Sequence, residues 1–228
     1  VIHATLDPQQ QRLTGVEAIH YTNNSPTALQ SLWVQLDQNL YRADARARFV
    51  RGRLDAPSTP GYALESVEIE RGGHRQRADY LVSDTRMQIR LPQALKAYGG
   101  KLTLDIHYHY RVPDGGFGGR TGYMPSSNGP IYAIAQWYPR MAVYDDVRGW
   151  DTLPYLGNEF YLEYGDFDYY ITVPRDMVVA GSGALQNPAR VLSRQQRARL
   201  ARARGSEQTV TIRSAGEVLP STSCSSSG

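Results

Sequence analysis

The stretch "KLTLDIHYHYRVP", residues 101–113, carries the clearest structural signal in the sequence. Its apolar residues Leu102, Leu104 and Ile106 alternate with Thr103 and Asp105, which is the period-two pattern of a β-strand. Such alternation is typical of antiparallel sheets in which one face is covered and the other meets solvent. The segment therefore predicts a sheet of this kind.

Similar strand-like segments occur along most of the chain. Their spans are 13–24, 29–36, 62–70, 79–92, 159–174, 177–185 and 208–214, the fourth of them reading as a hairpin. Turn signals separate them at intervals of roughly 8 to 12 residues, the spacing expected of sandwiches or barrels. We therefore predict an all-β fold of mainly antiparallel sheets. Three long loops are expected at 37–61, 112–130 and 145–158, where functional residues often lie.

One helix is predicted, over "PARVLSRQQRARLARAR", residues 188–204. Pro188 suits the first turn of a helix, and the apolar stripe is narrow, so we expect a surface helix. This segment contains six arginines and no acid, whereas the rest of the chain has 19 basic and 22 acidic residues. A slightly acidic body argues against a general nucleic-acid-binding face.

Length and cysteine content set further bounds. The 228 residues allow one large domain or two small ones. No apolar run approaches the ~20 residues needed to span a bilayer. Cys224 is the only cysteine, so an intrachain disulfide and a zinc site of the Cys-pair type are both excluded. The chain starts without Met or a visible signal peptide, so we expect it to begin within a longer protein. Both the cytoplasm and the bacterial envelope are compatible with this sequence.

Familiar catalytic patterns are missing from the sequence. His107 and His109 share one strand face, but a zinc site needs three or four protein ligands and no H-E-x-x-H occurs. Asp145 and Asp146 belong to an acid-rich region, yet a glycosidase pair depends on a distance that sequence does not supply. We therefore predict no catalytic residue and no metal ligand in this chain.

The stretch "AIAQWYPRMAVYDDVRGWDT", residues 133–152, mixes aromatic and polar side chains without a period. Clustered aromatic residues stack on sugars or form protein interfaces. One hypothesis is therefore an aromatic-rich β-sandwich that binds carbohydrate through Trp33, Trp137 and Trp150. Another is an interaction protein whose arginine-rich helix, 188–204, binds an acidic partner or a membrane surface.

Three motifs, taken together, resemble the N-terminal domain of gluzincin zinc aminopeptidases, the aminopeptidase N and leukotriene-hydrolase type. The first, in residues 6–41, is L-x-G-x-x-x-I-x-Y-x-N-x-S followed by L-x-x-L-W-x-x-L. The second, in residues 136–174, combines Q-W-Y-P-R, G-W-x-T-x-P-Y and E-F-Y-x-E-[YF]-G-D-[YF], and is similar to a bacterial subgroup. The third is "VVAGSGALQNP", residues 178–188. All three occur in the family's order.

The resemblance implies a single saddle-like domain of curved sheets over residues 1–220. The low-complexity composition of residues 221–228 separately predicts a disordered or non-native tail. Such a domain lines the substrate cleft and packs on a catalytic domain, which in this family carries H-E-x-x-H and the zinc ion. We thus expect a non-catalytic part of a zinc aminopeptidase, without a cofactor of its own. Its expected partners are that catalytic domain and the N-terminus of a peptide substrate, not nucleic acid.

The resemblance also singles out residues. In the family, a Gln or Glu of this domain helps to hold the free α-amino group or first side chain of the substrate, and by motif position that residue is Gln136. A side-chain amide oxygen accepts a hydrogen bond from an ammonium group and carries no full charge to desolvate. Trp137, Tyr138 and Arg140 are expected to shape the cleft wall or the domain interface. A carbohydrate-binding or protein-interaction module remains the alternative.

Overall fold

The computed structural model describes residues 1–50, 57–115, 120–127, 129–156 and 160–217. The chain divides into two compact units: one is Val1–Pro125 with Pro130–Val173, and the other is Ser126–Gly129 with the residues from Pro174 onward. The predicted tail at 221–228 lies outside the described residues, and the predicted single domain over 1–220 stays a prediction.

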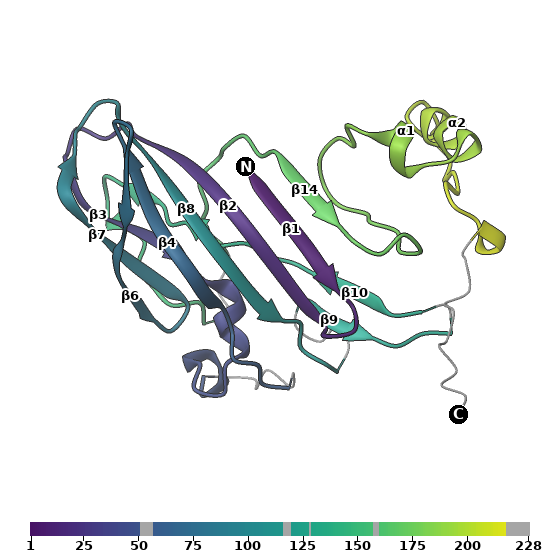
Figure 1. Cartoon of the computed structure of the whole chain (residues 1–228), viewed down its shortest axis with the longest axis horizontal. Helices are drawn as coiled ribbons and strands as arrows, with labels where there is room; N and C mark the ends of the chain where they lie inside the picture. Colours follow the sequence, from purple (N-terminus) through teal and green to yellow (C-terminus); the bar gives the residue numbers. More distant parts are fainter. Residues whose placement is uncertain (51–56, 116–119, 128, 157–159, 218–228) are drawn as a thin grey trace. The chain divides into compact units, whose positions relative to one another are not determined.

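A six-stranded sheet forms the larger layer of the first unit, in the order β14-β1-β2-β8-β4-β5. Its strands are β1 (Ile2–Asp7), β2 (Arg12–Asn23), β4 (Ala63–Arg71), β5 (His74–Arg77), β8 (Gly100–Arg111) and β14 (Tyr169–Thr172). Figure 1 shows β14, β1, β2, β8 and β4 side by side. Every neighbouring pair is antiparallel except β1 with β14.

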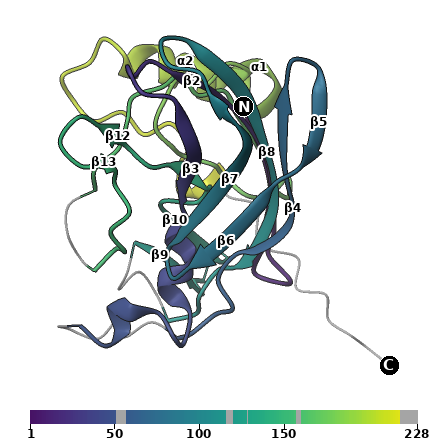
Figure 2. The same ribbon diagram turned by 90° about the vertical axis from the view of Figure 1, so that its left-hand side faces the viewer.

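A four-stranded antiparallel sheet, ordered β11-β3-β7-β6, forms the second layer. Its strands are β3 (Leu29–Gln35), β6 (Asp79–Ser83), β7 (Arg86–Leu95) and β11 (Arg140–Met141). Two short hairpins, β9 (Thr121–Met124) with β10 (Ile131–Ile134) and β12 (Tyr144–Asp145) with β13 (Gly149–Trp150), and two 3-10 turns, η1 (Asp37–Tyr41) and η2 (Arg46–Arg48), complete the unit. The turned view of Figure 2 brings β3, β7 and β6 forward.

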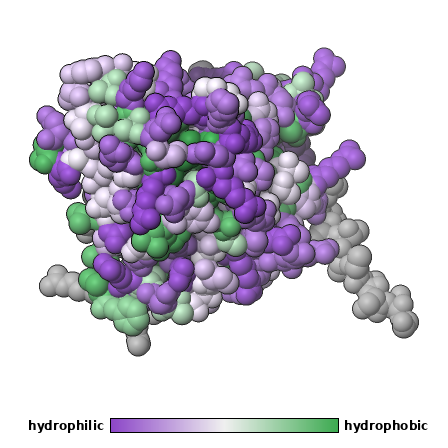
Figure 3. Space-filling model, turned by 60° about the vertical axis from the view of Figure 1, so that its left-hand side comes forward, coloured by the Kyte–Doolittle hydropathy of each residue, from purple (hydrophilic) through white to green (hydrophobic). Residues whose placement is uncertain are grey.

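The hydrophobic core of this unit lies between the two sheets. The six-stranded sheet contributes alternate residues of β8, such as Leu104 and Ile106, and the four-stranded sheet contributes Val34, Met87 and Ile89. These five side chains are fully buried. The alternation at 101–113 therefore marks the inner face of a sandwich, and the prediction of an all-β fold of mainly antiparallel sheets is confirmed. On the face seen in Figure 3, hydrophilic residues predominate and apolar residues form small patches.

Three predicted strands are wrong in whole or in part. The segment 159–174 forms a strand only at Tyr169–Thr172, because it pairs with β1 from Ile2 onward and its earlier described residues have no strand beside them. The segments 177–185 and 208–214 contain no strand. Strand propensity alone does not form a strand, since the backbone groups need a hydrogen-bonding neighbour.

The predicted helix at 188–204 is two helices, α1 (Pro188–Val191) and α2 (Arg194–Ala203). Ser193 interrupts them because it caps α2: its hydroxyl accepts from the backbone N–H of Gln196 at 3.2 Å, and the side chain of Gln196 accepts from the N–H of Ser193 at 3.0 Å. This capping box is recognisable as S-x-x-Q in the sequence. A 3-10 turn, η3 (Ala215–Glu217), follows. Within the described ranges, no helix is both long and apolar enough to cross a membrane.

Candidate functional site

Side chains from the first unit's core hold the backbone of three consecutive residues in the Q-W-Y-P-R motif region. Gln38, which is buried in η1, donates from its amide to the carbonyls of Ala135 at 2.9 Å and Gln136 at 3.0 Å. The hydroxyl of Tyr110, on β8, donates to the carbonyl of Trp137 at 3.2 Å. The path of the chain at this point therefore depends on residues about 30 and 100 positions earlier.

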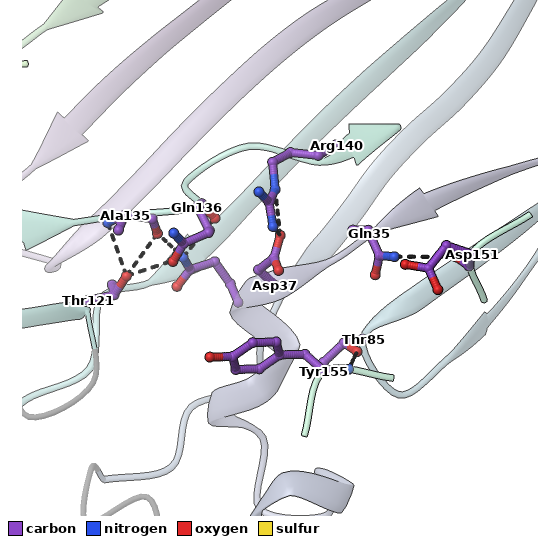
Figure 4. Close-up of polar contacts among 10 residues, drawn as sticks. Gln35, Asp37, Thr85, Thr121, Ala135, Gln136, Arg140, Asp151 and Tyr155 are labelled. Carbon is purple, nitrogen blue, oxygen red and sulfur yellow. Dashed lines mark hydrogen bonds and ion pairs between the residues drawn. The ribbon is translucent and has the colours of Figure 1, made fainter. Parts of the chain in front are cut away.

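Thr121, at the start of β9, reinforces this arrangement. Its hydroxyl donates to the carbonyl of Ala135 at 3.0 Å, and its backbone N–H donates to the hydroxyl of Tyr41 at 3.2 Å. The amide of Gln38 also lies 3.4 Å from the Thr121 hydroxyl. Figure 4 shows Thr121, Ala135 and Gln136 gathered on one side of the ion pair between Asp37 and Arg140. The backbone of residues 135–137 is thus held by side chains from η1, β8 and β9.

Gln136 has an unusual backbone conformation, with φ at +47°. This left-handed region is uncommon for a residue with a Cβ, and such outliers often occur at functional positions. Its side chain is half-buried, and its amide makes no hydrogen bond to any residue that the structure describes. The predicted substrate-binding residue therefore combines a fixed backbone with an unengaged amide group.

Arg140 forms a buried ion pair with Asp37. Both side chains are about 90% buried, with exposed fractions of 9% and 10%, and both Nε and Nη2 of Arg140 bond to Oδ2 of Asp37, at 2.9 and 2.7 Å. Burial raises the pKa of Asp37, and the Arg140 guanidinium offsets part of that increase. The pair links β11 to η1. Breaking it would be costly, because removal of one member would leave the other charge buried and unpaired. The guanidinium of Arg140 also lies 4.9 Å from the ring centre of Phe160.

Trp137 and Tyr138 are half-buried and pack against the main core. Their rings meet edge to face at 4.8 Å, Trp137 also contacts Tyr169 at 6.0 Å, and Tyr138 contacts Phe167 at 5.7 Å. Burial raises the pKa of the Tyr138 hydroxyl, and the Arg140 guanidinium offsets part of that increase. The expected role of Trp137 and Tyr138 in a cleft wall or a domain interface stays a prediction.

Residues 151–155, in the G-W-x-T-x-P-Y motif, contact the ends of β3 and β7. The backbone N–H of Tyr155 donates to the Thr85 hydroxyl at 3.1 Å, and the Gln35 amide reaches the carbonyl of Asp151 at 3.5 Å (Figure 4). Arg86 donates to the carbonyl of Thr152. This part of the predicted loop 145–158 is therefore held against the four-stranded sheet.

Asp145 stabilises a turn. Its carboxylate accepts from the backbone N–H groups of Val147 at 2.9 Å and Arg148 at 2.6 Å, and from the Tyr161 hydroxyl at 3.1 Å. These hydrogen bonds hold its pKa below the ordinary value. The carboxylate of Asp145 is therefore committed to a local turn.

The histidines on β8 do not converge on a metal site. His109 Nδ1 lies 2.8 Å from Oε1 of Glu65, and His107 shares its sheet face. Across the part of the chain that the structure describes, no group of three or more His, Cys, Asp or Glu side chains is placed to hold a metal ion.

Glu17 is a buried acid that the sequence analysis missed. It lies on the inward face of β2 with 3% of its surface exposed, and burial raises its pKa to about 8. Its Oε2 has no hydrogen-bond partner among the described residues, and neither does the Tyr108 hydroxyl. The signal was the alternation of Leu13, Gly15 and Glu17, which places an acid in register with core residues.

Gly15 explains how Tyr108 fits beside this acid. A Cβ on Gly15 would lie 2.4 Å from the Tyr108 hydroxyl oxygen and 2.2 Å from its ring. The missing side chain therefore lets the phenol lie directly against β2. Burial raises the pKa of Tyr108, and the nearby Glu17 carboxyl raises it further.

Comparison with protein-family models gives no match, and comparison with curated proteins gives none either. Among solved structures, the chain is similar to an M1 zinc metallopeptidase of Deinococcus radiodurans, at 15% identity and a TM-score of 0.34, over 54% of this chain and 22% of that one. It is also similar to a two-domain M1 zinc metallopeptidase mutant bound to L-tryptophan, at 16% identity and a TM-score of 0.34, over 55% and 23% of the two chains. The match thus spans less than a quarter of either peptidase and concerns the fold alone.

Proposed function

We propose that this chain is the non-catalytic N-terminal domain of a zinc aminopeptidase, in which it lines the substrate cleft and packs on a catalytic domain. The proposed family rests on the motif resemblance, and the proposed role of Gln136 rests on one structural observation. Three successive carbonyls at Ala135, Gln136 and Trp137 are bound by core side chains, while the Gln136 amide has no hydrogen-bond partner among the described residues. A binding residue on a rigid backbone loses little entropy when its ligand arrives.

Gln136 acts in this proposal as an acceptor for the substrate's α-ammonium group. The amide oxygen bonds the cation without being ionised, so the site does not bury an unpaired negative charge when no substrate is bound. The left-handed φ of Gln136 costs roughly 1 kcal/mol, and the bonds from Gln38 offset it. Trp137 and Tyr138 form the adjacent wall.

Exposed aromatic residues near the end of the first unit support the packing role. Tyr164 is fully exposed, and Tyr161, Phe167, Tyr169 and Tyr170 are also among the exposed large residues. Aromatic residues are enriched in protein interfaces, and exposed groups of them mark interaction sites. We propose that these exposed aromatic residues, in the segment 161–170, contact the catalytic domain.

The carbohydrate-binding alternative has less support. Trp33, Trp137 and Trp150 are all half-buried, and Trp150 has its ring against Tyr144 at 5.1 Å and Tyr21 at 6.1 Å. A sugar-stacking platform requires open ring faces.

The zinc ion of the proposal belongs to the catalytic domain, whose residues would hold it.

The test uses the longer polypeptide that the proposal requires. Its reading frame must encode H-E-x-x-H beyond Gly228, and the purified enzyme must release amino acids from aminoacyl-p-nitroanilides. Gln136→Ala is expected to lower kcat/KM about 10- to 100-fold, as for the loss of one hydrogen bond to a charged group. Gln136→Glu should retain activity because it keeps the acceptor, and Gln76→Ala, at an exposed site on β5, is the matched control.

Equal kcat/KM values for Gln136→Ala and Gln76→Ala would refute the role of Gln136 while leaving the domain assignment standing. A reading frame without H-E-x-x-H would refute the assignment itself.

A further inference from the structure

We propose that α2 is an electrostatic docking surface for anionic phospholipid headgroups. The solvent-facing side of this helix carries four exposed arginines and no acid. They are Arg194, Arg197, Arg202 and, at the C-cap, Arg204. Ala198 and Ala201 lie between them and are also exposed. Because these side chains are short, they do not prevent the four guanidinium groups from contacting the same flat surface.

The orientation of α2 follows from its opposite side. Arg199, Leu200 and Ala203 are half-buried there. Arg199 is paired with Glu217 and donates to the carbonyl of Ile212 at 3.2 Å, which attaches the helix to the end of the second unit. The four exposed arginines make no ion pair with any residue that the structure describes. Their charges are therefore available to a partner.

The whole segment 174–217 is basic, with eight arginines, three acids and no lysine, a formal net charge of +5. A guanidinium group binds a phosphate through two parallel hydrogen bonds and is more weakly hydrated than an ammonium group. This composition fits a surface of phosphate diesters. A helix of ten residues is about 15 Å long and covers several lipid headgroups.

Two observations favour a lipid surface over nucleic acid. The segment 174–217 contains no aromatic residue and no histidine, so it lacks the stacking groups on which single-stranded nucleic acid is bound. It does expose four apolar side chains, Val178, Val179, Leu185 and Val191. Exposed apolar side chains of a basic segment add to binding at a lipid interface, whereas a phosphate backbone gives them no partner.

The expected binding is reversible and salt-dependent. A basic residue close to an anionic membrane contributes about fivefold to partitioning, so four together contribute several-hundredfold. Salt at about 1 M shortens the screening length to ~3 Å and should abolish most of the binding. The inference does not depend on the proposed peptidase role, because it uses no residue of the Gln136 site.

The experiment is co-sedimentation of the 228-residue chain with vesicles of phosphatidylcholine alone or with about 30% phosphatidylserine, an anionic composition typical of the lipids that attract basic segments. One variant replaces the four exposed arginines of α2 by glutamine, and another replaces them by lysine. The matched control replaces four exposed basic residues of the first unit by glutamine: Arg77, Arg90, Lys96 and Lys101. Circular dichroism and thermal unfolding verify that each variant is folded.

We expect binding to the anionic vesicles only, a loss of at least a hundredfold in the arginine-to-glutamine variant, and at most a tenfold loss in the lysine variant and the control. Equal losses in the α2 variant and the control would overturn the proposal, since the net charge of the chain rather than the surface of α2 would then determine vesicle binding. Absence of binding to anionic vesicles, or tighter binding to a DNA duplex or an RNA strand than to the vesicles, would overturn it as well.

Discussion

Replacement of Glu17 by glutamine should stabilise the protein increasingly as the pH rises from about 4.5 to about 8. Burial raises the pKa of Glu17 from 4.5 to about 8, so the native state retains a proton that the unfolded chain releases in this interval. The native state binds more protons than the unfolded state, and its stability therefore falls with increasing pH. Below about pH 4.5 both states are protonated and the penalty is absent.

The size of the effect follows from the separation of the two pKa values. Each pH unit corresponds to about 1.4 kcal/mol, so about three and a half units give roughly 5 kcal/mol at pH 8. Relaxation of the surroundings on ionisation reduces this value, and we expect about 3–5 kcal/mol. Glutamine has nearly the same volume and no ionisable group, so Glu17→Gln removes the pH-dependent term without opening a cavity.

The assay is urea denaturation followed by tryptophan fluorescence, at steps from about pH 5 to about pH 8. The unfolding free energy of the parent chain should fall relative to that of Glu17→Gln by about 1.4 kcal/mol per pH unit above about pH 5, and the decrease should level off toward pH 8, where Glu17 ionises in the native state. Glu207→Gln, at an exposed position, serves as the control and should track the parent chain. A constant difference between the parent and Glu17→Gln across the whole range would refute the reasoning, because it would mean that Glu17 is ionised and solvated in the native state.

Three further substitutions test one buried ion pair, one close packing contact and one helix cap. Arg140→Ala should cost about 3–5 kcal/mol in urea denaturation because it leaves Asp37 buried and unpaired, whereas replacing both partners by leucine should recover most of the loss. Gly15→Ala should cost about 1–3 kcal/mol through its clash with Tyr108, and the cost should shrink in a Tyr108→Leu background, as thermal unfolding will show. Ser193→Ala should cost about 1 kcal/mol at the start of α2 and increase hydrogen exchange in its first turn without affecting the sheets.

The strands were predictable where apolar and polar residues alternate over much of a segment. The predicted segments 13–24 and 101–113 correspond to β2 and β8, which pair in register over their whole lengths. Alternation is a local property, because successive side chains of a strand point to opposite faces. The segment 159–174 has equally favourable composition but only four residues in a strand, because a strand also requires a paired neighbour that local sequence does not reveal.

The candidate site was predictable only in part. The motif resemblance points to Gln136, Trp137, Tyr138 and Arg140 as neighbours along the chain. Their surroundings come from elsewhere: Asp37 and Gln38 approach from η1 and Tyr110 from β8. A polar side chain in a loop gives no sign of its partner when that partner lies about a hundred residues away.

The amino-acid sequence by itself determined the β class, the strands with alternating apolar residues, a helical region within 188–204 and the arginine excess of that region, since each depends on neighbours in the chain. The tertiary structure alone decided which acid is buried and which is exposed, and which backbone groups are bound. Glu17 and Glu65 are both strand glutamates, but one faces the core and the other faces solvent beside His109. The physical reason is that ionisation and hydrogen bonding depend on the dielectric surroundings and on partners in space, and only the packing of the two sheets brings these together.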